Sequence, residues 1–169
     1  MTSETTFTIR KAVKEDAPRI VEVINKAYSR DPCYIDSFRR IDKVDEISDL
    51  IQNNSYQFYL LISPERELCG TICLNLPQGK FSHFSMSSDR PEYKGKGGLL
   101  LKRVESAASV LKIQKLGFAT LSLAGKLIQY YKDNGYTEVS RTPARDSWRQ
   151  NLKPEFRDTA SWVSMSKSI

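Results

Sequence analysis

Three glycines and two lysines stand together directly ahead of an apolar helical pattern, and they are the residues best suited to bind a phosphate. The stretch consists of Lys94, Gly95, Lys96, Gly97, Gly98 and Leu99. A helix that begins there presents free backbone N–H groups and the positive end of its dipole. The glycines let a ligand approach the backbone closely, and the lysines add full positive charge. The stretch is typical of a phosphate-binding turn, although an ordinary tight turn before a helix has the same composition.

The single histidine, His83, has the one side chain whose ordinary pKa lies near neutrality. A group with that pKa is suited to act as a general base at pH 7. His83 alternates with Phe84 in a strand-like run, so the two side chains are expected to face opposite sides of a sheet. The competing interpretation is a partly buried structural histidine.

Three cysteines, an odd number, argue against a disulfide framework. Cys69 and Cys73 are four residues apart in an expected strand, which predicts one shared face and a separation of roughly 13 Å. That separation suits neither a disulfide nor a compact metal site. We interpret these two and Cys33 as small hydrophobic residues, and we predict no metal site.

The composition is that of an ordinary globular protein, with 40% hydrophobic and 27% charged residues in a chain of 169. We expect one domain spanning residues 1–169. The net charge of +6 favours anionic partners, but the basic residues form no long runs and argue only weakly for nucleic acid. No apolar run approaches about 18 residues, and no apolar leader follows the first four residues. We therefore expect no membrane partner and a cytoplasmic location, with the nucleus as the alternative.

The hydrophobic periodicity predicts strands and helices that must position these residues. The expected strands are 7–11, 57–62, 68–76, 80–86, 118–123, 136–141 and 159–165. Helices are expected from an N-cap at Asp16 to Tyr28, from 44 to about 53, from the glycine turn to about 111, and over 127–133. The basic residues between 141 and 157 recur every four positions, but Pro143 and Pro154 argue for a solvated loop. The fold class is α/β (α+β), with a mixed, mostly antiparallel sheet of about seven strands flanked by helices on both faces.

With its motifs in this order and spacing, the chain resembles the GNAT superfamily of N-acetyltransferases over nearly its whole length. Four stretches carry the resemblance: 8–12 followed by Glu15 and Asp16, 69–72, 84–86 followed by 91–97, and 127–136. The third resembles the acetyl-CoA signature of the family, and the fourth its block of two apolar residues, two aromatic residues and a glycine. The signature departs from the usual pattern in Lys94 and in the run Gly97–Leu99. Ala124 replaces a frequent asparagine, and Lys80 lies near the place of a catalytic glutamate in some relatives.

The resemblance implies an acyltransferase that moves the acetyl group of acetyl-CoA to a primary amine by direct attack in a ternary complex. The pyrophosphate would bind the N–H groups of residues 94–99, and the pantetheine arm would lie along Phe84, Ser85 and Met86. By position in the family block, Tyr131 would return a proton to the departing thiolate; its alternative role is aromatic packing. The family builds its acceptor pocket around residues 34–40, and dimers are frequent in it, so a homodimer is one expected assembly.

Two other classes of function remain open from the sequence. The altered glycine motif, Ala124 and the missing glutamate are compatible with a catalytically weak acyl-CoA-binding or regulatory module of the same fold. Such a module would bind coenzyme A without turnover. A basic nucleic-acid-binding domain would instead show binding that falls steeply with salt.

Overall fold

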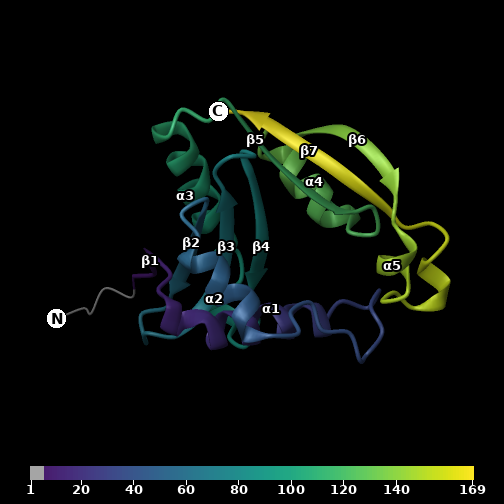
Figure 1. The fold of residues 1–169 in the computed structure, drawn as a ribbon, viewed down its shortest axis with the longest axis horizontal. Coiled ribbons are helices and arrows are strands. Elements are labelled where there is room, and N and C mark those ends of the chain that lie inside the picture. The colour runs from purple at the N-terminus through teal and green to yellow at the C-terminus, as the bar shows by residue number, and fades with distance from the viewer. Residues whose placement is uncertain (1–5) are drawn as a thin grey trace.

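The apolar runs of the chain form seven strands, which hydrogen-bond into one sheet in the order β1-β2-β3-β4-β5-β7-β6 (Figure 1). This computed structural model describes residues 6–169. The strands are β1 (Thr8–Lys11), β2 (Tyr56–Ile62), β3 (Leu68–Asn75), β4 (Lys80–Met86), β5 (Lys115–Leu121), β6 (Thr137–Pro143) and β7 (Ser161–Ser168). The predicted fold class and element order are confirmed. The fifth strand begins three residues before its predicted start. The leader prediction rests on residues 1–4, which lie outside the described residues.

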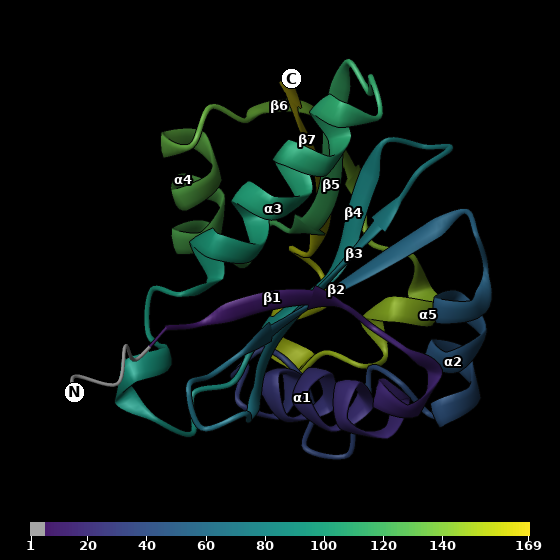
Figure 2. The same cartoon turned by 90° about the vertical axis from the view of Figure 1, so that its left-hand side faces the viewer.

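The helices cover both faces of this sheet (Figure 2). They are α1 (Ala17–Ser29), α2 (Val44–Gln52), α3 (Gly97–Val110), α4 (Gly125–Asp133) and the short α5 (Asp146–Arg149). One core cluster joins the sheet to α3 and α4, and a second joins the opposite face to α1 and α2. Apolar residues at helical spacing produce this arrangement, as in α1, where Ile20, Val23 and Ile24 are buried. None of the helices in residues 6–169 has the length and apolar character needed to cross a bilayer.

Asp16 is the N-cap residue of α1, as predicted, but its side chain does not cap the helix. The Asp16 carboxylate makes no cap bond to α1 and instead accepts hydrogen bonds from Arg10, at 2.7 and 2.8 Å, and from the N–H of Val13 at 2.8 Å. It thereby closes a 3-10 turn (Lys14–Asp16) that precedes the helix. The hydrogen bond from Arg10 is the main reason that the pKa of Asp16 is lowered.

The predicted shared face of Cys69 and Cys73 is also wrong. The β2–β3 register shifts between Leu61 and Ile62, because a β-bulge places an extra residue in β3. Cys69 therefore belongs to the core cluster under α3, and Cys73 to the cluster under α1. Both are fully buried free thiols, and burial raises the pKa of Cys69 to about 11 and that of Cys73 to about 12. They are packing residues, as predicted.

The segment 141–157 is not the solvated loop that its charges predicted. It contains the end of β6, the helix α5 and a 3-10 turn (Pro154–Phe156), and Ala144 and Leu152 in it are buried. It packs against the loop after α1: the N–H of Ile35 donates to the carbonyl of Asn151 over 2.9 Å. The prolines do exclude a continuous basic helix, but the apolar residues between the charges fold the segment onto the protein.

Candidate active site

The site begins where two neighbouring parallel strands separate. β4 and β5 pair only at Lys80 and Gly117; beyond that point β4 pairs with β3 alone and β5 with β7 alone. The two strands therefore diverge, as Figure 1 shows. A cavity of about 830 Å³ lies in the gap, lined by the end of β4, the inner edge of β5, the start of α4 and the end of α1. Main-chain groups along the open strand edges are available to a ligand there.

β4 carries residues that were predicted to contact the cofactor, and one of them has main-chain groups that face this gap. In the β3–β4 ladder, the N–H of Ser87 donates to the carbonyl of Cys69 over 2.8 Å. Antiparallel ladders alternate, so the main-chain groups of Ser85 also face β3, and those of Met86 face the gap. Of these two residues, Met86 is the one with an N–H directed toward the cavity.

The glycine turn forms the first turn of α3 beside the gap. Three of its amides already donate to main-chain carbonyls of the turn, over 3.0–3.1 Å. These are the hydrogen bonds from Lys94 to Pro91, from Lys96 to Tyr93 and from Leu99 to Lys96. Within residues 6–169, the amides of the three glycines have no main-chain acceptor. No side chain caps the helix start. The free donors of this turn therefore come from Gly95, Gly97 and Gly98.

Gly97 lets the start of α3 pack closely on β4. A Cβ at this position would lie 3.3 Å from Met86 Cγ and 3.4 Å from Phe84 Cζ, both on β4. Gly95 has φ of +79°, a conformation that side chains rarely adopt. Free amides, the helix dipole and two lysines at this cradle fit an acyl-CoA pyrophosphate.

A second cavity of about 310 Å³ lies on the other side of the gap and brings two predicted catalytic residues together. Its lining includes His83 from β4 and Tyr131 from α4. Phe84, Ala119 and Thr120 line both cavities, so the two meet between the diverging strands.

His83 occupies a β-bulge that turns its ring toward this second cavity. The β3–β4 register shifts here, and His83 has φ of +51°. The hydroxyl of the buried Thr71 donates to the His83 carbonyl over 2.9 Å and holds the bulge. The imidazole packs against Phe58 at 5.7 Å, whereas Phe84 packs on the opposite core, so the predicted opposite facing is confirmed. Burial, and then the charge of Arg40, lower the pKa of His83 to about 4, so the ring is neutral at pH 7.

Tyr131 is a core residue that also reaches the cavity wall. It is 2% exposed, and its ring centroid lies 4.1 Å from that of Phe118. Within the described part of the chain its hydroxyl makes no hydrogen bond, although Tyr131 lines the cavity. Burial, followed by the neighbouring Tyr130, raises the pKa of Tyr131, so the phenol is protonated at neutral pH. Packing and a proton-donating role are compatible in this position.

Sequence reasoning missed most of the aromatic wall of the second cavity. Tyr28, Trp148 and Trp162 line it, and the ring centroids of the two tryptophans are 5.2 Å apart. Behind them, Tyr34 and Phe38 contact both Tyr28 and Trp148. A bridge between Tyr34 and Leu152 joins the loop after α1 to the segment that carries Trp148. The resemblance pointed to residues 34–40, but the partners from 148 and 162 come together only through the sheet topology.

No family profile and no curated protein sequence matches this chain. Solved structures are similar to it over nearly its whole length. A dodecameric spermidine N-acetyltransferase from Vibrio cholerae has a TM-score of 0.68 at 16% identity, covering 96% of this chain and 93% of its own. A protein proposed to be a phosphinothricin N-acetyltransferase has a TM-score of 0.72 at 15% identity, covering 96% and 98%. IAA acetyltransferase from Bacillus cereus has a TM-score of 0.67 at 14% identity, covering 97% and 100%.

At these identities the likeness is one of fold. The chain has the fold of GNAT-type N-acetyltransferases, as the resemblance of its sequence predicted.

Proposed function

We propose that this protein, acting as one domain, is an N-acetyltransferase that moves the acetyl group of acetyl-CoA to a primary amine in a ternary complex. One observation carries the proposal: β4 and β5 separate after a single pair, beside a helix start with free glycine amides. Gly97 of this turn lies against Met86 and Phe84, and Phe84 also lines the cavity that contains His83 and Tyr131. The fold of the solved neighbours supports the same reaction class.

The turn and β4 would hold the cofactor. The amides of Gly95, Gly97 and Gly98 would bind the pyrophosphate, with Lys94 and Lys96 supplying charge. The main chain of Phe84–Met86 would lie along the pantetheine arm. When bound, acetyl-CoA supplies an activated acetyl thioester. The N–H of Met86, on the gap side of β4, is the candidate donor to the thioester oxygen, where negative charge develops during attack.

Two side chains would manage the protons. A lysine-like amine has a pKa of about 10.4, so only about one molecule in a few thousand is neutral at pH 7. The amine would react in its neutral form, and His83, which is neutral at that pH, would accept the proton that the nitrogen loses as its bond to the acetyl carbon forms. The amine nitrogen bonds to the acetyl carbon as the carbon–sulfur bond breaks. Tyr131 would donate its proton to the departing thiolate, and the products are the N-acetyl amine and coenzyme A.

Calorimetric titration with acetyl-CoA tests the cofactor half of this proposal. Gly97→Asp places a side chain and a negative charge where the pyrophosphate would bind, so we expect the micromolar binding of the wild type to be lost. Ser106→Asp is the matched control, because it adds the same charge to an exposed site of α3 about 13 Å along the helix. Circular dichroism checks that both variants fold. Absence of binding by the wild type, or unchanged binding by Gly97→Asp, would contradict the proposal.

A further inference from the structure

The charge of the second cavity restricts the amines that it can accept. Among residues 6–169, its lining contains no aspartate and no glutamate, and Arg40 is the one lining residue with a permanent charge. The rest of the lining is aromatic, apolar or neutral and polar. Tyr28, Phe84, Trp148 and Trp162 supply the aromatic surfaces.

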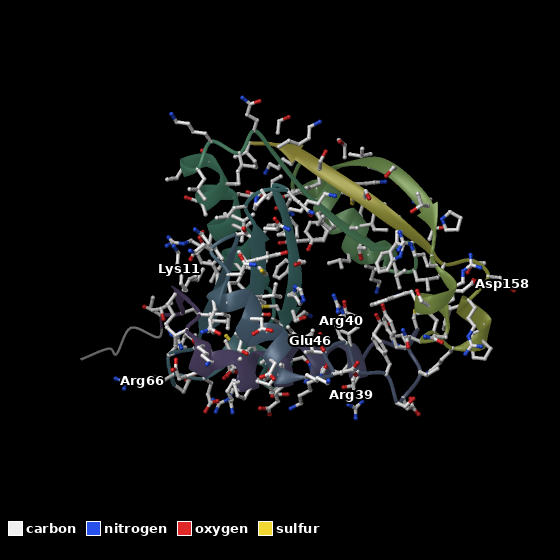
Figure 3. The ribbon with its side chains drawn as sticks, in the orientation of Figure 1. Lys11, Arg39, Arg40, Glu46, Arg66 and Asp158 are labelled. Carbon is white, nitrogen blue, oxygen red and sulfur yellow. The ribbon has the colours of Figure 1, made fainter. Side chains whose placement is uncertain are left out.

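Arg40 has no carboxylate partner among residues 6–169. Its guanidinium lies over the ring of Trp148, 5.7 Å from the centroid. Figure 3 shows Arg40 pointing into the space between β4 and the C-terminal strands, and the neighbouring Arg39 pointing the opposite way. An arginine that is held on an aromatic face and lacks a carboxylate is ready to bind an anion.

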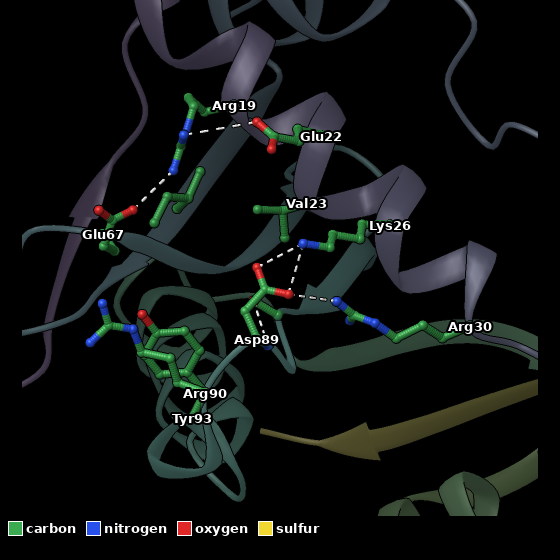
Figure 4. Close-up of a pocket in the computed structure, with 11 residues that line it drawn as sticks. Arg19, Glu22, Val23, Lys26, Arg30, Glu67, Asp89, Arg90 and Tyr93 are labelled. Carbon is green, nitrogen blue, oxygen red and sulfur yellow. Dashed lines mark hydrogen bonds and ion pairs between the residues drawn. The ribbon is translucent and has the colours of Figure 1, made fainter.

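A separate pocket beside α1 differs from this cavity, because it contains carboxylates that pair with its cations. Lys26 and Arg30 both bond to Asp89, at 2.8 and 2.9 Å, and Arg19 bonds to Glu67 at 3.1 Å (Figure 4). Three of the four cations that line this pocket of about 260 Å³ are thus paired with its own carboxylates, and the fourth, Arg90, pairs with Glu92. Arg40 differs from them because the cavity around it provides no counterion.

We infer that the acceptor is a primary amine that also carries a carboxylate, as an amino acid with an apolar or aromatic side chain does. This inference rests on the proposed function. The carboxylate would pair with Arg40, the side chain would lie against Trp148 and Trp162, and the amine would face the gap near His83. A polyamine would instead place its additional ammonium groups beside Arg40 with no carboxylate to pair them. The acceptor class thus differs from the spermidine named for one structural neighbour.

The test compares matched amines with and without the carboxylate. The substrates are L-phenylalanine with 2-phenylethylamine, L-leucine with 3-methylbutylamine, and spermidine, each assayed by release of coenzyme A thiol. We expect the wild type to prefer the amino acid of each pair by at least tenfold in kcat/KM. Arg40→Gln should reduce that ratio to near one, Arg40→Lys should restore part of it, and Arg39→Gln, the exposed neighbour, should leave it unchanged. Binding of L-phenylalanine in the presence of coenzyme A, followed by calorimetry, should weaken in Arg40→Gln.

The outcomes separate the inference from the proposed function. Equal or faster acetylation of the carboxylate-free amines, or a ratio that Arg40→Gln does not change, overturns the inference and leaves the acetyltransferase in place. If acetyl-CoA binds but no amine in the panel is acetylated, the proposed function fails, and the inference fails with it.

Discussion

The two sides of the gap between β4 and β5 are built in different ways. On the cofactor side, the proposed ligand contacts are main-chain amides within one short stretch, Lys94–Leu99, and along the end of β4. On the acceptor side they are side chains from distant segments, among them Tyr28, Arg40 and Trp148. The first side needs only a local backbone conformation, whereas the second exists only once the sheet and its connections have formed. We therefore expect substitutions on the two sides to affect different ligands.

The largest expected effect is at the junction of the two sides. Tyr131→Phe removes the proposed proton donor but keeps the ring that packs on Phe118, so kcat should fall by about 10²–10⁴-fold. Acetyl-CoA affinity should be nearly unchanged, because the hydroxyl acts on the departing thiolate. Steady-state kinetics and calorimetry measure the two quantities. Tyr56→Phe, which removes a phenol outside the site, is the control; full activity of Tyr131→Phe would assign Tyr131 to packing alone.

The next effect is a pH dependence of stability that originates at His83. The pKa of His83 is about 4 in the folded chain, against an ordinary value of 6.5. Between these values the unfolded chain binds more protons, so the free energy of unfolding should rise with pH from about 4 to 6.5 and gain nothing further above that. The contribution is on the order of 3 kcal/mol. Denaturant titrations of wild type and His83→Gln across this range should differ in slope, and parallel curves would contradict the burial of the ring.

A smaller effect should distinguish the acceptor side from the cofactor side. Trp148→Ala removes the aromatic surface under Arg40, so the KM for the amine should rise about tenfold, about 1.4 kcal/mol. The dissociation constant for acetyl-CoA should stay close to that of the wild type, the reverse of the result expected for Gly97→Asp. Equal losses of both ligands in a folded Trp148→Ala variant would show that the two sides are not independent.

The smallest effect concerns the bulge that orients His83. Thr71→Val keeps the volume of a buried residue but removes its hydrogen bond to the His83 carbonyl, which should lower the free energy of unfolding by about 1 kcal/mol. Chemical denaturation measures the change. Thr142→Val, at an exposed position of β6, provides a matched control. A Thr71→Val protein as stable as the control variant would show that the bulge does not depend on this bond.

The sequence was sufficient to predict the element order and the start of α3 at the glycines, because both depend on local patterns. Period-two and period-3.6 runs identified the strands and helices, and the glycines of residues 95–98 marked the helix start. The start of the fifth strand was predicted three residues too late, because Lys115 and Gly117 have low strand propensity although they pair with β7.

Two of the errors, at Cys69 and in the segment 141–157, have one physical origin: both features depend on contacts with residues distant in the sequence. The bulge beside Cys69 reverses the face of that side chain, and only the register with β2 reveals it. The segment 141–157 was judged by its charges, yet its apolar residues pack on the loop after α1. The same long-range packing assembles the proposed acceptor cavity, so Arg40, which has no carboxylate partner among residues 6–169, could not be recognised from the spacing of residues 34–40.

Transfer of a labelled acetyl group tests the central claim most directly. Acetyl-CoA labelled in the acetyl carbonyl would be incubated with the protein and the panel of amines, and the products separated by chromatography. The account predicts that the label appears in an N-acetyl amine only when protein and amine are both present, and that Tyr131→Phe slows its appearance. If acetyl-CoA binds but the label stays in it, or leaves only as acetate, the protein is an acyl-CoA-binding module of this fold and not an N-acetyltransferase.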